Sequence, residues 1–219
     1  MASCAQPPGK AAPSGRICGC SCSFSSVARS GLGVLLCGFL LVLGSCGDPA
    51  AEGFQLRLDA VQDALGAGEN SAALGKARSV LVEQPDNAVA LLGAARACLG
   101  LDRFNEAVEY ATAGLEHAGR DPALAADLHW AQGKAFLALY LQLQADADWR
   151  AANSALERGT ESAGTYRADA AYALFRMQGL GGLGSDGRRD RFGQIFLKLE
   201  PSGPRADKVR TITGGGESR

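Results

Sequence analysis

The sequence predicts an all-α protein, an α-solenoid of about three helical hairpins with a C-terminal capping helix. Apolar and small residues recur three and four positions apart over most of the chain, which is the spacing that one face of an α-helix requires. Long alternating runs rich in Val, Ile and Thr are absent, which argues against a large sheet. The helical pattern also returns at a fixed interval, which is typical of stacked repeats.

The clearest hairpin lies in residues 88–116. Its two periodic runs, Val89–Leu99 and Phe104–Leu115, are separated by the short segment Gly100–Arg103. Alanine and glycine stand where the two helices would cross, and such small residues allow a close approach. The sequence therefore predicts an antiparallel pair of helices, with Cys98 on the buried face of the first.

An equivalent hairpin precedes it, with expected helices Phe54–Leu65 and Ser71–Glu83. Three of its inward residues return 34 positions later, where Val61, Ala73 and Ala77 are matched by Ala95, Ala107 and Ala111. Hairpins with this period resemble the tetratricopeptide repeat, and the residues that carry the resemblance are Leu91, Ala94, Ala95, Cys98, Gly100, Phe104, Ala107 and Ala111. The resemblance implies stacked hairpins with a concave groove that binds a protein or peptide.

A third hairpin is expected from Ala125–Leu141 and Trp149–Glu157. Its crossing residues, Gly133 and Ala152, are nineteen positions apart, against twelve in the earlier hairpins. The first helix of this hairpin should therefore be longer by about two turns of 3.6 residues.

Three further helices complete the expected helical domain, which covers residues 54–212. Tyr166–Gln178 continues the repeats, and Phe192–Leu199 with Arg205–Ile212 forms a shortened repeat and cap. Residues 213–219 are expected to be a flexible tail.

Three segments are expected before the helical domain. Residues 1–26, rich in Pro, Ser, Gly and Ala, have the composition of a disordered leader. Residues 27–45 have the pattern of a secretory signal, with a basic residue, an apolar run over 31–43 and a small-residue exit. Leu43–Cys46 resembles the lipobox of bacterial lipoproteins, which implies a lipid on Cys46 and a tether over 46–53. An aspartate directly after the cysteine is absent, so the resemblance implies the outer membrane.

Two other interpretations of the apolar run stay open, an uncleaved signal anchor and a buried core helix. The run is short for the roughly 20 apolar residues of a spanning helix. Because a signal of 45 residues would be long, we hypothesise that translation begins at Val27.

The resemblance also implies a binding groove on the first helices of the second and third hairpins. Arg96 and Lys134 would pair with a ligand carboxylate, and Trp130 would supply an apolar anchor. The alternative is that Trp130 packs inside its hairpin and that both cations are only solvated. The groove residues would be Val89, Leu92, Arg96, Leu99, Asp127, Trp130, Lys134 and Leu137.

Other chemistry finds little support in the sequence. Gly179–Gly184 spells G-x-G-x-x-G, but the dinucleotide motif follows a strand and a helix is expected here, which favours a plain connector. The three cysteines in residues 18–22 lack the second pair of a zinc site. His117 and His129 belong to no catalytic motif. With a net charge of −1, the sequence predicts no cofactor, metal, disulfide or nucleic-acid partner.

These patterns favour a non-catalytic scaffold for protein–protein interaction. It would be a lipoprotein of the bacterial cell envelope, facing the periplasm, that serves as an assembly or biogenesis factor. The alternative function is a periplasmic module that captures a peptide or a small ligand, such as a peptidoglycan fragment, in the same groove. An enzyme is the least favoured class.

Overall fold

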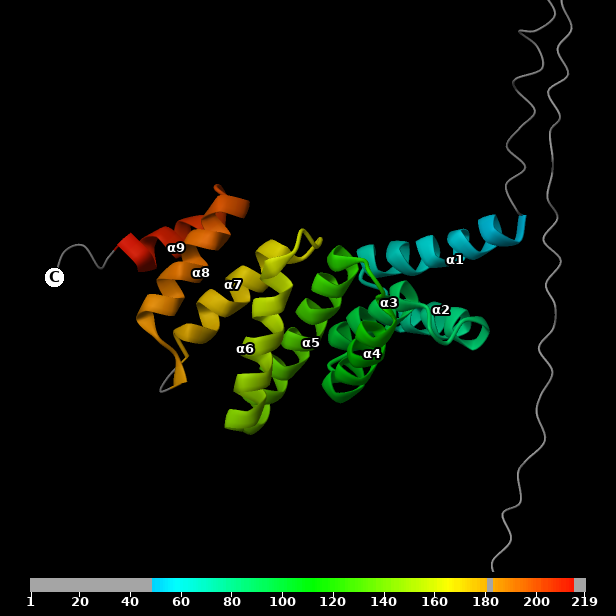
Figure 1. Cartoon of the computed structure of the whole chain (residues 1–219), viewed down its shortest axis with the longest axis horizontal. Helices are drawn as coiled ribbons and strands as arrows, with labels where there is room; N and C mark the ends of the chain where they lie inside the picture. The colour runs from blue at the N-terminus through cyan, green and yellow to red at the C-terminus, as the bar shows by residue number, and fades with distance from the viewer. Residues whose placement is uncertain (1–48, 181–182, 215–219) are drawn as a thin grey trace, which may run out of the picture. The chain divides into compact units, whose positions relative to one another are not determined.

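Nine helices and no strand make up the part of the chain that the structure describes, residues 49–180 and 183–214. The structure is a computed structural model (Figure 1). Its helices are α1 (Pro49–Gly66), α2 (Asn70–Glu83), α3 (Ala88–Gly100), α4 (Phe104–His117), α5 (Pro122–Leu143), α6 (Asp146–Glu161), α7 (Arg167–Gln178), α8 (Asp186–Leu199) and α9 (Pro204–Gly214). The predicted all-α fold class is confirmed.

Side-chain caps mark where two of the hairpins begin. At the start of α3, Asn87 Oδ1 accepts a hydrogen bond from the backbone N–H of Ala90 at 2.9 Å. Before α5, Asp121 Oδ1 accepts from the N–H groups of Ala123 and Leu124 at 3.0 and 3.1 Å. These bonds satisfy donors that the first turn of a helix leaves free, so the chain begins each helix at a defined residue.

The helices stack as successive hairpins. Helices α1 and α2, α3 and α4, α5 and α6, and α7 and α8 pack pairwise, and each pair also packs against the next one. The first helices of neighbouring hairpins touch as well, and we call α1, α3, α5 and α7 the first-helix row. In Figure 1 the hairpins follow one another in chain order, from α1 in cyan to α8 and α9 in orange and red. This arrangement is an α-solenoid of helical hairpins, as predicted.

Small residues allow the helices to cross closely. A Cβ atom at Gly93 would lie 2.8 Å from Val61 Cγ1, and one at Gly133 would lie 2.6 Å from Leu156 Cγ. Either contact is shorter than packed carbon atoms tolerate, so a larger residue would push the helices apart. The predicted crossing alanines are all fully buried: Ala73, Ala77, Ala95, Ala107, Ala111 and Ala152.

The helix lengths agree with the expected break in the repeat. Helix α5 has 22 residues and α3 has 13, so the first helix of the third hairpin is extended as the wider spacing predicts. At the other end of the domain, α1 begins at Pro49, and residues 49–53, expected to belong to a tether, are helical. Proline is favoured at the first position of a helix, and Glu52 is favourable in the first turn.

The apolar core runs along the stack as overlapping clusters. One cluster gathers buried residues mainly from α1 to α4, the next from α3 to α5, and the largest from α5 to α9. None of the helices in residues 49–180 and 183–214 is both long and apolar enough to cross a bilayer. The expected leader, signal segment and Cys46 lie outside the residues that the structure describes, as do residues 215–219.

Candidate functional site

The eight predicted groove residues lie on α3 and α5, which are neighbours in the first-helix row. Their side chains differ in exposure. Val89 is exposed and Lys134 is exposed, whereas Leu92 and Asp127 are only 6% and 7% accessible. Leu92 packs in the core with Leu128, so its side chain is not presented on the surface. The predicted set therefore contains core residues as well as surface residues.

Arg96 is held by side chains of its own chain. Its Nη1 donates a hydrogen bond of 2.6 Å to Oε1 of Gln62, which lies on α1. Its guanidinium carbon also lies 4.9 Å from the ring centroid of Tyr166, within the range of a cation–π contact. Gln62 stands 34 positions before Arg96, so the bond joins equivalent places in two successive hairpins.

Tyr166, in the turn before α7, also contacts α5. Its ring stacks on Trp130 with centroids 4.0 Å apart and an interplanar angle of 14°. Its backbone N–H donates to Asp127 Oδ1 at 3.1 Å, and burial raises the pKa of the Tyr166 hydroxyl. Tyr166 therefore brings together Arg96, Asp127 and Trp130, three of the predicted groove residues.

Trp130 packs partly into the protein. Its half-buried ring contacts two of the core clusters, and its Nε1 is buried with no hydrogen-bond partner among the described residues. This packing matches the alternative of a Trp130 inside its hairpin more closely than a free apolar anchor. Sequence analysis did not select Tyr166 for the site, because nothing in a lone tyrosine before a helix shows which ring it will meet.

Of the other predicted groove residues, Leu99 is partly buried against two core clusters. Lys134 and Leu137 line a cavity of about 340 Å³. Most of its lining residues lie on α5 and α7, and Arg205 comes from the first turn of α9. Its lining residues are Lys134, Leu137, Leu141, Asp169, Tyr172, Ala173, Arg176, Leu180 and Arg205. The cavity thus combines an apolar surface with cationic groups.

Arg205 is fixed in the wall of this cavity. Its guanidinium forms ion pairs with Asp169 at 2.5 Å and with Glu200 at 2.8 Å. It also lies 5.3 Å from the ring centroid of Tyr172 and 5.5 Å from that of Phe196. The hydrogen bond to Asp169 is the main cause that raises the pKa of Arg205. Arg205 therefore serves mainly to bind α9 to α7.

Lys134 and Arg176 are different, because neither forms an ion pair with any residue that the structure describes. Both side chains are exposed and both line the cavity. They lie on α5 and α7, on either side of it. They are the two cations of the cavity that remain available to a ligand.

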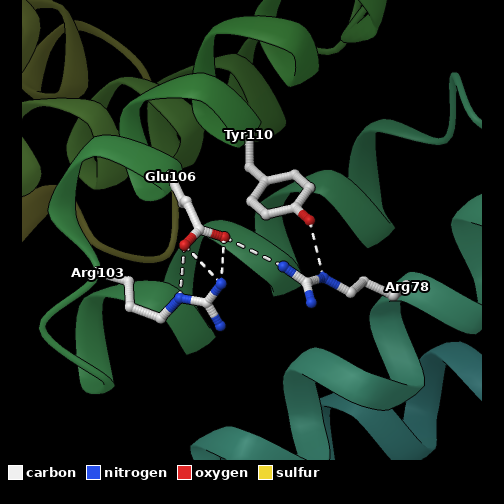
Figure 2. Close-up of polar contacts among 4 residues, drawn as sticks. All are labelled: Arg78, Arg103, Glu106 and Tyr110. Carbon is white, nitrogen blue, oxygen red and sulfur yellow. Dashed lines mark hydrogen bonds and ion pairs between the residues drawn. The ribbon is translucent and has the colours of Figure 1, made fainter.

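A second polar cluster joins α2 to α4 (Figure 2). Arg78 on α2 donates from Nη2 to Glu106 Oε2 at 3.1 Å and from Nε to the Tyr110 hydroxyl at 3.0 Å. Arg103 donates to both oxygens of the same carboxylate at 2.6 Å. The Tyr110 bond is the main cause that raises the pKa of Arg78. Both arginines share the single carboxylate of Glu106, so this cluster connects two hairpins through its bonds.

The glycine-rich stretch after α7 is a connector between helices. A helix precedes it, whereas the dinucleotide motif needs a strand. A Cβ at Gly184 would lie 2.1 Å from the carbonyl oxygen of Gln178, so glycine is required for this close backbone approach. The buried Gln178 accepts from the N–H of Ser185 at 3.1 Å and donates to Asn153 at 2.9 Å. These bonds attach the connector to α6 and α7.

No group of three or more His, Cys, Asp or Glu side chains suited to a metal ion occurs within residues 49–180 and 183–214. Cys18, Cys20 and Cys22 lie outside those residues. Cys98 is a buried free thiol, and burial is the main cause that raises its pKa. His117 is exposed in the last turn of α4.

His129 is partly buried, and its pKa is lowered, first by burial and then by the nearby Arg158.

The fold and this face define a class, the α-solenoids of stacked helical hairpins. Residues 64–129 match the family model of the tetratricopeptide repeat, and this segment runs from the last turn of α1 through α2, α3 and α4 into α5. Two crystal structures of MamA are similar in fold, both with 20% sequence identity. One has a TM-score of 0.55 and covers 76% of this chain and 84% of MamA; the other has a TM-score of 0.54 and covers 72% and 84%. No curated protein matches the sequence.

Proposed function

We propose that this chain is a non-catalytic scaffold that binds another protein through its first-helix row. The observation that carries the proposal is the cavity between α5 and α7, in which Lys134 and Arg176 have no ion-pair partner among the described residues. The match to the tetratricopeptide repeat supports it, because stacked helical repeats expose extended surfaces that bind proteins.

We further propose that the scaffold is a lipoprotein of the bacterial cell envelope, anchored through Cys46 and facing the periplasm. The support is the order of segments in the sequence, a basic residue, an apolar run and Leu43–Cys46. With Gly47 after the cysteine, we propose the outer membrane as its location and assembly or biogenesis of an envelope complex as its role.

A lipid on Cys46 is tested by metabolic labelling with an alkyne fatty acid in the native bacterium. We expect the wild-type chain to be labelled and to fractionate with membranes, and Cys46→Ser to lose both properties. Cys98, the cysteine that the structure describes in the helical domain, is fully buried, so it is not accessible to acylation. Equal labelling of the Cys46→Ser chain would contradict the anchor.

Protein binding is tested by cross-linking in intact cells, followed by purification of the full chain and identification of what it carries. We expect one or a few partners in defined amounts that are lost when Lys134 and Arg176 are both changed to glutamate. Recovery of the chain without any partner, at every level of cross-linker, would contradict the scaffold function.

A second candidate function is capture of a small ligand. The observation that favours it is the cavity volume of about 340 Å³, which lies within the range of small-molecule sites. Retention of a small molecule by the purified chain, detected by mass spectrometry after denaturation, would favour this candidate over the scaffold.

A further inference from the structure

We infer that the cavity between α5, α7 and α9 recognises an acidic side chain and an apolar side chain that stand two positions apart in an extended segment of the partner protein. This inference rests on the proposed function and adds the chemistry of what is bound. It is carried by the charge and by the apolar surface of the cavity.

The charge of the cavity favours an anion. Lys134, Arg176 and Arg205 supply three positive charges to its lining and Asp169 supplies one negative charge. Glu200, behind Arg205, removes one more, and a net charge of +1 remains. The compensation is local to Arg205, which both carboxylates contact. The two unpaired cations, Lys134 and Arg176, are therefore the ones that a ligand carboxylate can reach.

The surface between these cations favours an apolar side chain. Leu137, Leu141 and Leu180 line the cavity together with the ring of Tyr172. Leu141 is 53% accessible although it lies on a helix that is otherwise well packed. A ligand side chain that covers this exposed leucine would stabilise the complex by about 25 cal/mol for each Å² of apolar surface removed from water. A simple anion would leave this surface uncovered.

The dimensions favour a short part of a peptide. A volume of about 340 Å³ is at the lower end of the range for ligand sites, so it admits a few side chains but not a folded element. Because the cations lie on α5 and α7, an extended segment could place a carboxylate near either helix and an apolar side chain between them. Asp or Glu two positions from Leu or Phe has this chemistry, because side chains two positions apart in an extended segment point to the same side.

The inference is tested by peptide selection on the full chain. Random nine-residue peptides displayed on phage are selected on the wild type and on two double variants. Lys134→Glu with Arg176→Glu reverses the two unpaired cations. Arg120→Glu with Lys208→Glu makes the same change in net charge at exposed positions outside the cavity.

We expect the wild type and the Arg120/Lys208 control to enrich the same peptides, with Asp or Glu two positions from Leu or Phe. The dissociation constant of a selected peptide, measured by fluorescence anisotropy, should rise by about tenfold or more in the Lys134/Arg176 variant, which corresponds to the loss of a charge-assisted bond. It should also rise with salt, because the cations are exposed. Circular dichroism of all variants is the control for folding, and we expect each variant to be as helical as the wild type.

Selection of the same peptides by the Lys134/Arg176 variant would overturn the inference, as would enrichment of neutral or basic peptides. Enrichment of the chain's own C-terminal sequence, which contains Glu217, would assign the cavity to the tail and overturn it as well. These results would leave the scaffold function standing if cross-linking still recovers a protein partner. Recovery of the wild-type chain without any partner in the cross-linking experiment would instead contradict the proposed function.

Discussion

At the scale of single residues, Tyr166 holds more of the candidate face together than any residue selected from the sequence. It contacts α3 through Arg96 and α5 through Trp130 and Asp127. The aromatic stack and the cation–π contact each stabilise a fold modestly. Because they meet on one ring, removal of that ring affects two neighbours, Arg96 and Trp130, at once.

Tyr166→Ala is therefore expected to lower the free energy of unfolding by about 2 kcal/mol. It should also shift the tryptophan emission to longer wavelength, because the face of Trp130 that Tyr166 covers would meet water. Urea denaturation and fluorescence measure both effects. Tyr166→Phe keeps the ring and serves as the control, with a stability and emission close to the wild type. An alanine variant as stable as the phenylalanine variant would contradict the role of the ring.

At the scale of helices, the sequence predicted the first two helix pairs, and two of its groove residues, Lys134 and Leu137, line the cavity. The interval of 34 residues located α1 to α4 because small residues must stand where helices cross, and that requirement is visible in a single sequence. After Ala111 the interval changes, since α5 is nine residues longer than α3 (22 against 13).

That change explains which residues were missed. Asp169, Arg176 and Arg205 lie on helices beyond the break, so no repeat position relates them to Lys134. Their approach to α5 depends on how α7 and α9 pack, which local patterns do not show. Lys134 and Leu137 were found because they lie on the helix whose offsets still matched the repeat.

We predict that Arg78 on α2 and Glu106 on α4 contribute to stability in a coupled way. Arg78→Met and Glu106→Gln, made singly and together, should give a double variant that loses less stability than the two single losses combined (Figure 2). The coupling should fall at about 1 M salt, where charges are screened within about 3 Å.

The control for this cycle is Arg150 with Asp146, an exposed pair whose closest atoms are 3.8 Å apart. It should show a smaller coupling, because exposed pairs of this geometry contribute little. Denaturation midpoints of both sets of variants decide the matter. Additive losses at Arg78 and Glu106 would mean that the bonds in Figure 2 do not act together.

At the scale of the whole domain, neighbouring hairpins stabilise one another and distant hairpins do not touch. The core is divided into overlapping clusters along the stack, and among the described residues α1 and α2 have no extensive packing contact with α7, α8 or α9. Stability in such arrays is the sum of local terms and of terms between neighbours. A destabilising substitution at one end of the stack should therefore lower the local stability of that end and leave the other end unchanged.

Phe196→Ala tests this locality. Phe196 is fully buried on α8, beside Tyr172 of α7, and its loss should lower the free energy of local unfolding by about 3–5 kcal/mol. Hydrogen exchange should show reduced protection in α7, α8 and α9 and unchanged protection in α2 and α3. Leu74→Ala, a large-to-small change of a buried side chain on α2, should show the reverse distribution. Equal loss of protection over the whole domain would indicate a single cooperative unit.

The length of α5 has a consequence for how this protein can diversify. Its final turns carry Leu141, which would have no place beside the cavity if α5 ended where α3 does. Adding or removing a turn at this end of α5 would add or remove apolar lining of the cavity, while the helix crossings in the first two hairpins keep their spacing. An insertion in α5 would thus change the shape of this cavity without changing the packing of the first two hairpins.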